Sequence, residues 1–152
     1  MAAKEWHLFT VAQTNAVVAT IEPMLGRMTT AARRLAMAKA RLDELTEAMR
    51  ANGSGREAAA LQEEIEDLVS ELHDVVGALE EAGVEVKDVE GGIVDFPARH
   101  QGRVVLLCYR PGEGEVRCWH EVDDGFAGRQ PIATLDDETL GRDGRGTVQP
   151  DR

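Results

Sequence analysis

The sequence predicts an α+β fold: a long, coiled-coil-like antiparallel hairpin of two helices, followed by a small antiparallel β-sheet. Apolar residues recur at alternating steps of three and four over residues 17–49 and again over 58–82, which is the spacing of a coiled-coil seam. The breaker sequence at 51–55 leaves a connection so short that the helices must run antiparallel. After Gly83 the pattern changes to a period of two, which is typical of strands.

The first helix is expected to span residues 10–51. Thr10 and Gln13 form a T-x-x-Q capping box at its start, in which each side chain accepts a hydrogen bond from the other residue's backbone. Pro23 lies inside the helical pattern, where proline removes a backbone donor and clashes with the preceding turn. We therefore expect a kink near Pro23, at residues 20–22, or two consecutive helices that share one direction.

The second helix is expected to span residues 54–82. Ser54 and Glu57 form a second capping box at its start. Its seam continues without a fault, and Gly83 suits the left-handed residue that ends a helix.

The two helices carry opposite charge. Five basic and no acidic residues fall between Arg27 and Arg41, and nine acidic and no basic residues fall between Glu57 and Glu81. Opposite charge favours pairing of the helices. Each exposed ion pair contributes only about 0–1 kcal/mol, however, so solvated faces explain these charges equally well.

Both helices also have apolar residues outside the seam, and these predict a second contact surface. A homodimer that forms a four-helix bundle would cover them. The alternative is that the β-rich segment folds back over them. These residues are Leu25, Ala32, Ala36, Ala40, Val69 and Val76.

Length and composition predict one domain at 1–131, with a β-rich segment at 84–131 and a polar, Gly-rich, disordered tail at 132–152. The net charge of -11, from 17 basic and 28 acidic residues, repels phosphate backbones and argues against a nucleic-acid partner. No stretch approaches the roughly 20 apolar residues of a membrane span, and residues 1–10 do not form a signal peptide. With only two cysteines, the sequence favours the reducing cytoplasm.

Register in the β-rich segment follows from one hairpin, with a loop at 111–115 between strands at 103–110 and 116–122. If Arg110 pairs with Val116, Cys108 lies opposite Cys118 and Leu106 lies opposite His120. Side chains alternate between faces along a strand, and a slip of one residue would break this assignment. One face would then carry Val104, Leu106, Cys108, Cys118, His120 and Val122.

A metal site is one hypothesis for this face. Cys108, Cys118 and His120 supply the thiolate and imidazole ligands that zinc prefers, although a structural zinc site needs a fourth ligand. The local sequence offers none, and it lacks a C-x-x-C motif. The alternative is that both cysteines are free thiols that simply pack.

An acid–base or ligand pocket is the second hypothesis. It combines His120 with Glu121, Asp123 and Asp124, and with Arg129 as the partner of an anion. Histidine is the residue type that most often serves as an acid or base near neutral pH. Neighbouring strand residues face opposite ways, so His120 and Glu121 share a pocket only if the strand ends there. The alternative is that the three acidic residues belong to an exposed turn.

Asp95 stands in an apolar run, between Val94 and Phe96. A carboxylate in such a place must be paired or exposed. We expect it to face Arg103 or Lys87 across the sheet, in a structural role.

The chain contains several short motifs: Phe9-Thr10 with Asn15, Lys87-Asp88, Gly92, Val94-Asp95-Phe96, Leu107-Cys108, Trp119-His120-Glu121 and the run from Gly125 to Pro131. These motifs resemble those of a family of small uncharacterised bacterial proteins that is known only as a domain of unknown function. In that family a Trp usually stands at the position of Tyr109, and Cys118 is outside the shared pattern, which weakens the two-cysteine site. The resemblance supplies no activity, but it implies that Asp88, Asp95, His120, Glu121 and Arg129 belong to one constellation.

The sequence does not decide whether the protein is an enzyme. It contains no nucleotide-binding glycine loop, no Gly-x-Ser-x-Gly elbow and no His-Glu-x-x-His helix motif. A non-enzymatic scaffold or interaction protein is therefore the leading interpretation. The alternative is a metal- or anion-binding protein, or an enzyme, that uses His120 with nearby acidic residues and Arg129.

Overall fold

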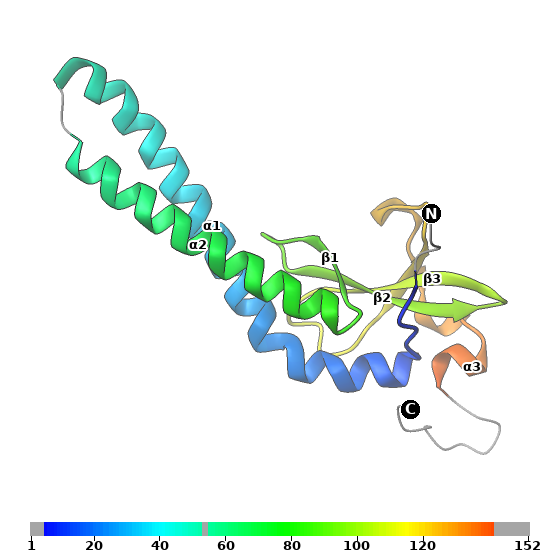
Figure 1. Cartoon of the computed structure of the whole chain (residues 1–152). Coiled ribbons are helices and arrows are strands. Elements are labelled where there is room, and N and C mark those ends of the chain that lie inside the picture. The colour runs from blue at the N-terminus through cyan, green and yellow to red at the C-terminus, as the bar shows by residue number, and fades with distance from the viewer. Residues whose placement is uncertain (1–4, 53–54, 142–152) are drawn as a thin grey trace.

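The computed structural model describes residues 5–52 and 55–141, and it has the expected α+β architecture. A long helical hairpin packs one of its ends against a five-stranded sheet, and its other end extends away from the sheet (Figure 1). None of the described helices is apolar over a length that could cross a membrane. The elements are α1 (Val11–Asn52), α2 (Arg56–Glu81), β1 (Glu85–Asp88), β2 (Ile93–His100), β3 (Arg103–Tyr109), β4 (Cys118–Glu121), η1 (Phe126–Gly128), β5 (Gln130–Pro131), η2 (Ile132–Thr134) and α3 (Asp137–Leu140).

Helix α1 starts at the predicted capping box. The Thr10 backbone N donates to Gln13 Oε1 at 2.9 Å, and the Gln13 backbone N donates to Thr10 Oγ1 at 3.0 Å. The helix is continuous through Pro23, and it visibly bends in its first half (Figure 1). It is therefore one bent helix rather than two, as proline in a helix interior leads one to expect.

Helix α2 begins two residues later than the predicted start at Ser54. Its first residue is Arg56, and its N-cap is Gly55, which makes no side-chain capping bond. Ser54 itself lies outside the described residues. The predicted end is confirmed, because Gly83 has a φ of +88°, in the left-handed region that glycine adopts without strain.

The sheet has the order β1-β2-β3-β4-β5, with all neighbours antiparallel. The predicted register is confirmed: Cys108 pairs with Cys118, and Leu106 pairs with His120. The strand expected from residue 116 begins at Cys118 instead. The reason is that the Val116 backbone N donates to Asn15 Oδ1 of α1 at 2.8 Å, rather than to a neighbouring strand.

The core lies between the sheet and the near end of the hairpin. Phe96 of β2 and Leu107 of β3 are fully buried against Leu25 and Met28 of α1 and Leu79 of α2. The β-rich segment therefore covers part of the surplus apolar surface of the helices. It does so only at this end, because no residue of α1 beyond Met28 belongs to the core cluster.

Residues 132–141 of the predicted tail are folded, which differs from the disorder expected for that part of 132–152. Residues 132–141 form η2 and α3, and Leu135 is buried in the core. The Asp136 side chain caps α3 by accepting from the Thr139 backbone N at 2.8 Å, and Gly141 ends it with a φ of +83°. The polar composition of residues 132–141 gave no indication that they fold. Two helix-capping residues and one buried apolar side chain are enough to hold them against the core. Residues 142–152 lie outside the described part of the chain.

Candidate functional site

The face of the sheet that points away from the core carries a second buried cluster. Alternation along the strands places Asp95 of β2, Cys108 of β3, and Cys118 and His120 of β4 on this face. Asp95 pairs in register with Cys108, which in turn pairs with Cys118. Asp95 is 1% exposed and His120 is 7% exposed, so a carboxyl group and an imidazole are both shielded from water here.

His120 uses both of its ring nitrogens. Nδ1 lies 2.9 Å from the Glu121 carbonyl oxygen, and Nε2 lies 3.1 Å from Asp95 Oδ2. A carbonyl oxygen can only accept, so Nδ1 carries a proton. A second proton must then lie between Nε2 and Oδ2, because two lone pairs would repel. Either imidazolium faces carboxylate or neutral imidazole faces carboxylic acid, and the pair has no net charge in both cases.

Burial raises the pKa of Asp95, because removal from water disfavours the charged carboxylate. His120 and then Lys87 act in the opposite direction without cancelling the effect of burial. Lys87 Nζ lies 4.0 Å from Asp95 Oδ2 and 3.5 Å from Glu85 Oε1. Asp95 therefore holds its proton more readily than an exposed aspartate does.

The second carboxyl oxygen of Asp95, Oδ1, is buried. The Cys108 thiol, which pairs in register with Asp95, hydrogen bonds to the carboxyl group and also opposes the effect of burial on its pKa. Asp95 also borders a cavity of about 260 Å³. The residues that line this cavity are Lys87, Ile93, Asp95, His120, Val122, Asp124 and Gly125.

The two cysteines lie side by side in register as free thiols. Burial raises the pKa of Cys108 to about 12, so its thiol keeps its proton at neutral pH. In the described part of the chain, no group of three or more His, Cys, Asp or Glu side chains is arranged to hold a metal ion. The zinc hypothesis for Cys108, Cys118 and His120 gains no support from this geometry and stays a prediction.

Glu121 points to the opposite face of the sheet from His120. Arg103 Nε donates to its carboxylate at 2.9 Å, and this bond lowers the pKa of Glu121. Glu121 therefore contributes only its backbone carbonyl to the cluster. Of the two cations considered for Asp95, Lys87 is the one that approaches it, since Arg103 is engaged with Glu121.

The remaining residues of the predicted constellation are spread apart. Asp88 is exposed and accepts from the Glu90 backbone N at 3.1 Å, so it stabilises a turn. Asp123 and Asp124 are both exposed, and Asp124 also lines the cavity. Arg129 is exposed and is not among the lining residues, although its charge lowers the pKa of Cys108. Asp95, His120 and Asp124 thus converge on the cavity.

Sequence reasoning missed a polar contact that positions β4. The Tyr109 hydroxyl donates to the Glu22 carboxylate and accepts from the Gly114 backbone N at 3.2 Å. Glu22 Oε1 also accepts from the Gly112 backbone N at 2.9 Å. Together these bonds tie the loop at 110–117 to α1. No short-range signal reveals them, because Glu22 and Tyr109 are distant in the chain.

The chain was compared with known protein families, curated proteins and solved structures. The model of a family described as an uncharacterized conserved protein, DUF2203, matches residues 7–132. The match includes the hairpin and every residue that lines the cavity. No curated protein and no solved structure matches the chain.

Proposed function

The chain belongs to the DUF2203 family of uncharacterised conserved proteins, and we propose that it binds a small molecule in the cavity beside Asp95 and His120. The observation that carries this proposal is the cavity itself, which the charged Lys87 and Asp124 and the apolar Ile93 and Val122 line beside the buried Asp95–His120 pair. Pockets for drug-sized molecules usually have about 300–1,000 Å³, so about 260 Å³ suits a smaller ligand.

The same geometry favours binding over catalysis. A histidine that acts as a general base needs a ring nitrogen that faces the substrate. Here Nδ1 is held by the Glu121 carbonyl and Nε2 by Asp95. His120 therefore orients Asp95 and shares its proton, and the exposed Lys87 and Asp124 are the charged lining groups left to contact a ligand.

A fragment screen by NMR tests this proposal. We expect small alkylamines, alcohols and amides to shift the backbone amides of Val122, Asp124 and Gly125. The variant Val122→Trp should abolish these shifts, because the indole would fill the cavity. The matched control Ala133→Trp adds the same ring at an exposed position away from the cavity and should leave the shifts intact. Shifts that persist in Val122→Trp, or no shifts with any fragment, would contradict the proposal.

Self-association through the hairpin is a second candidate function, and it would make the protein a scaffold or interaction protein. The part of the hairpin beyond the sheet buries its apolar residues incompletely. Met37 is 71% exposed and Val69 is 47% exposed. Several seam residues are also only half-buried: Leu35, Leu42, Leu45, Leu61 and Ile65.

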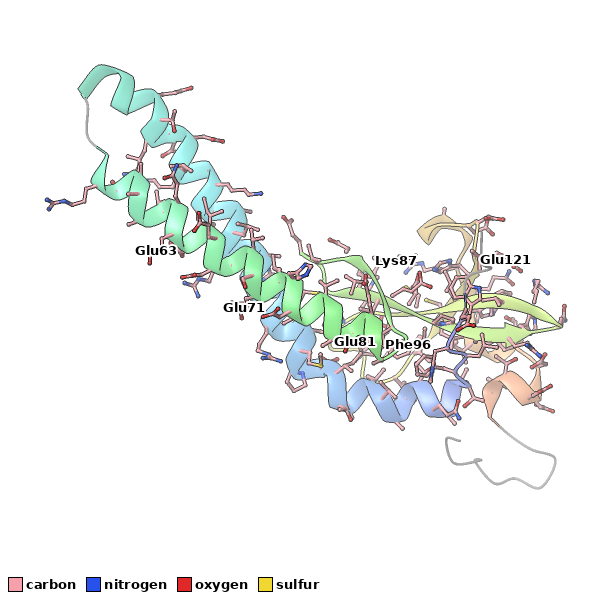
Figure 2. All side chains as sticks on the ribbon, viewed as in Figure 1. Glu63, Glu71, Glu81, Lys87, Phe96 and Glu121 are labelled. Atoms are coloured by element: carbon pink, nitrogen blue, oxygen red, sulfur yellow. The ribbon has the colours of Figure 1, made fainter. Side chains whose placement is uncertain are left out.

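Charge favours a second copy as the partner. Arg34 pairs with Glu64 at 3.3 Å and Arg41 pairs with Glu57 at 3.1 Å, so α1 and α2 attract each other within one chain. Helix α2 carries more acidic residues than α1 has basic ones. Glu63 and Glu71 project from the part of α2 that lies beyond the sheet (Figure 2). The α1 helix of a second copy would place basic residues beside them in a four-helix bundle.

Light scattering at micromolar concentration tests this second candidate. We expect the mass of a dimer for the unchanged protein and of a monomer for Met37→Glu combined with Val69→Glu. Both positions are exposed, so these changes should leave the fold intact. The control Ala133→Glu should remain dimeric. A monomeric unchanged protein would refute the homodimer.

A further inference from the structure

Cys108 and Cys118 form a pair of thiols on the sheet face that points away from the core. They lie directly opposite each other on β3 and β4, and their thiols are hydrogen-bonded to each other. Residues opposite each other in antiparallel strands have Cα atoms about 4.5–5.5 Å apart, and a disulfide usually spans about 4.4–6.8 Å between Cα atoms. The fold therefore holds both sulfur atoms where a disulfide can join them with little movement of the backbone.

The two thiols differ in their access to solvent. Cys118 is half-buried, whereas Cys108 is 2% exposed. Burial also raises the pKa of Cys108 to about 12, so very little of it is the reactive thiolate at neutral pH. A small oxidant from solvent therefore meets Cys118 first, and Cys108 lies behind it as a second thiol. An accessible cysteine beside a resolving cysteine is the arrangement of a redox sensor.

We propose that Cys108 and Cys118 are a redox site, which a hydroperoxide converts to a disulfide between β3 and β4. In a reducing compartment such a disulfide is transient, and transient disulfides there usually have catalytic or redox-sensing roles. The inference goes beyond the proposed function, because the reaction needs no ligand in the cavity.

The reaction has two steps. The Cys118 sulfur attacks one oxygen of the hydroperoxide, the O–O bond breaks, and the leaving alcohol takes the thiol proton, so Cys118 becomes a sulfenic acid. The Cys108 sulfur then attacks Cys118 Sγ, and the S–O bond of the sulfenic acid breaks. The Cys108 proton passes to the Asp95 carboxylate, which is hydrogen-bonded to this thiol, and then to the leaving hydroxide. Both thiols together lose two protons and two electrons, and the hydroperoxide is reduced to an alcohol and water.

Mass spectrometry of the full chain treated with hydrogen peroxide tests the reaction. The protein is kept dilute, so that disulfides between chains do not form. We expect the unchanged protein to lose the mass of two hydrogen atoms, and dithiothreitol to restore it. Cys108→Ser should instead stop at a sulfenic acid on Cys118, which dimedone traps.

The matched variant Cys118→Ser distinguishes the roles of the two thiols. It should react about tenfold more slowly than Cys108→Ser, because its remaining thiol is buried and protonated. Equal rates for these two variants would overturn the assignment of Cys118 as the thiol that reacts first. The absence of a disulfide from the oxidised unchanged protein would overturn the whole proposal.

An equilibrium measurement on the unchanged protein keeps the test independent of whether the variants fold. The chain is held in buffers of oxidised and reduced glutathione, and the fraction with the Cys108–Cys118 disulfide is measured in native buffer and in urea. We expect the disulfide to be about tenfold more favoured in the native protein, which corresponds to about 30 mV in reduction potential, because the fold holds the thiols together. Equal constants, or a disulfide favoured by urea, would show that the fold does not prepare the pair and would overturn the proposal.

Discussion

His120 Nε2 lies 3.1 Å from Asp95 Oδ2, and the two buried side chains, from strands that do not neighbour each other in the sheet, share one proton. The pair stands on the sheet face opposite the helices, across Leu106 and Cys108 of β3. Its neutrality lets it be buried without the full cost of two separate charges.

Removal of His120 should destabilise the protein, because Asp95 would remain buried without its partner. We expect His120→Ala to lower the free energy of unfolding by about 2–4 kcal/mol, measured by urea denaturation. The control Glu121→Ala removes an exposed ion pair on the opposite face and should cost about 1 kcal/mol or less. In a double-mutant cycle, Asp95→Ala with His120→Ala should cost less than the sum of the single changes. Additive costs would contradict the coupling of the pair.

Asp95→Asn should change how stability depends on pH. The folded pKa of Asp95 is raised, so its stabilising contribution is complete below its unfolded pKa of about 3.9. That contribution is lost as the pH rises through the folded value. Each pKa unit of difference is worth about 1.4 kcal/mol.

The asparagine variant does not titrate, so it should gain stability relative to the unchanged protein as the pH rises from about 4 towards neutrality. Thermal or urea unfolding at several pH values measures this difference. Parallel stability curves for the two proteins across that window would show that Asp95 has no raised pKa.

Tyr109→Phe should loosen the loop at 110–117. Burial raises the pKa of Tyr109 to about 12, so its hydroxyl stays protonated, donates to Glu22 and accepts from the Gly114 backbone N. We expect a loss of about 1–2 kcal/mol in stability and faster hydrogen exchange at the Gly114 amide. The Gly112 amide keeps its bond to Glu22 and serves as the internal control. Unchanged protection of Gly114 would show that this contact does not hold the loop.

Leu135→Ala should destabilise the whole domain, because Leu135 anchors residues 132–141 in the core. We expect a cost of about 2–4 kcal/mol by urea denaturation. The control Glu138→Ala changes an exposed residue of α3 and should have little effect. A stability unchanged by Leu135→Ala would mean that the segment folds without contributing to the core.

The sequence predicted those helices and strands whose positions depend on residues close together in the chain. The heptad spacing identified both helices, and the Thr10–Gln13 box placed the start of α1 within one residue. Alternation around Cys108 and Cys118 gave the register, because one short loop fixes the pairing of its strands. Alternation of side chains along a strand also indicated that His120 and Glu121 point to opposite faces of the sheet.

Contacts between distant residues were not predicted. The late start of β4 depends on Asn15 of α1, whose side chain accepts a hydrogen bond from the Val116 backbone N. The folding of 132–141 depends on Leu135 meeting a core built from other elements. The convergence of Asp95 with His120 required the full strand order, although their residue types had marked them as candidates.

The central claim is that both ring nitrogens of His120 are engaged, one by the Glu121 carbonyl oxygen and one by Asp95, so that the ring is not free to act as a general base. Long-range ¹H–¹⁵N spectra of the histidine rings test it most directly, because the ¹⁵N shifts report which nitrogen carries a proton. The geometry predicts that His120 Nδ1 is protonated at every pH at which the protein is folded. A His120 ring with an unprotonated Nδ1 at neutral pH would contradict the account.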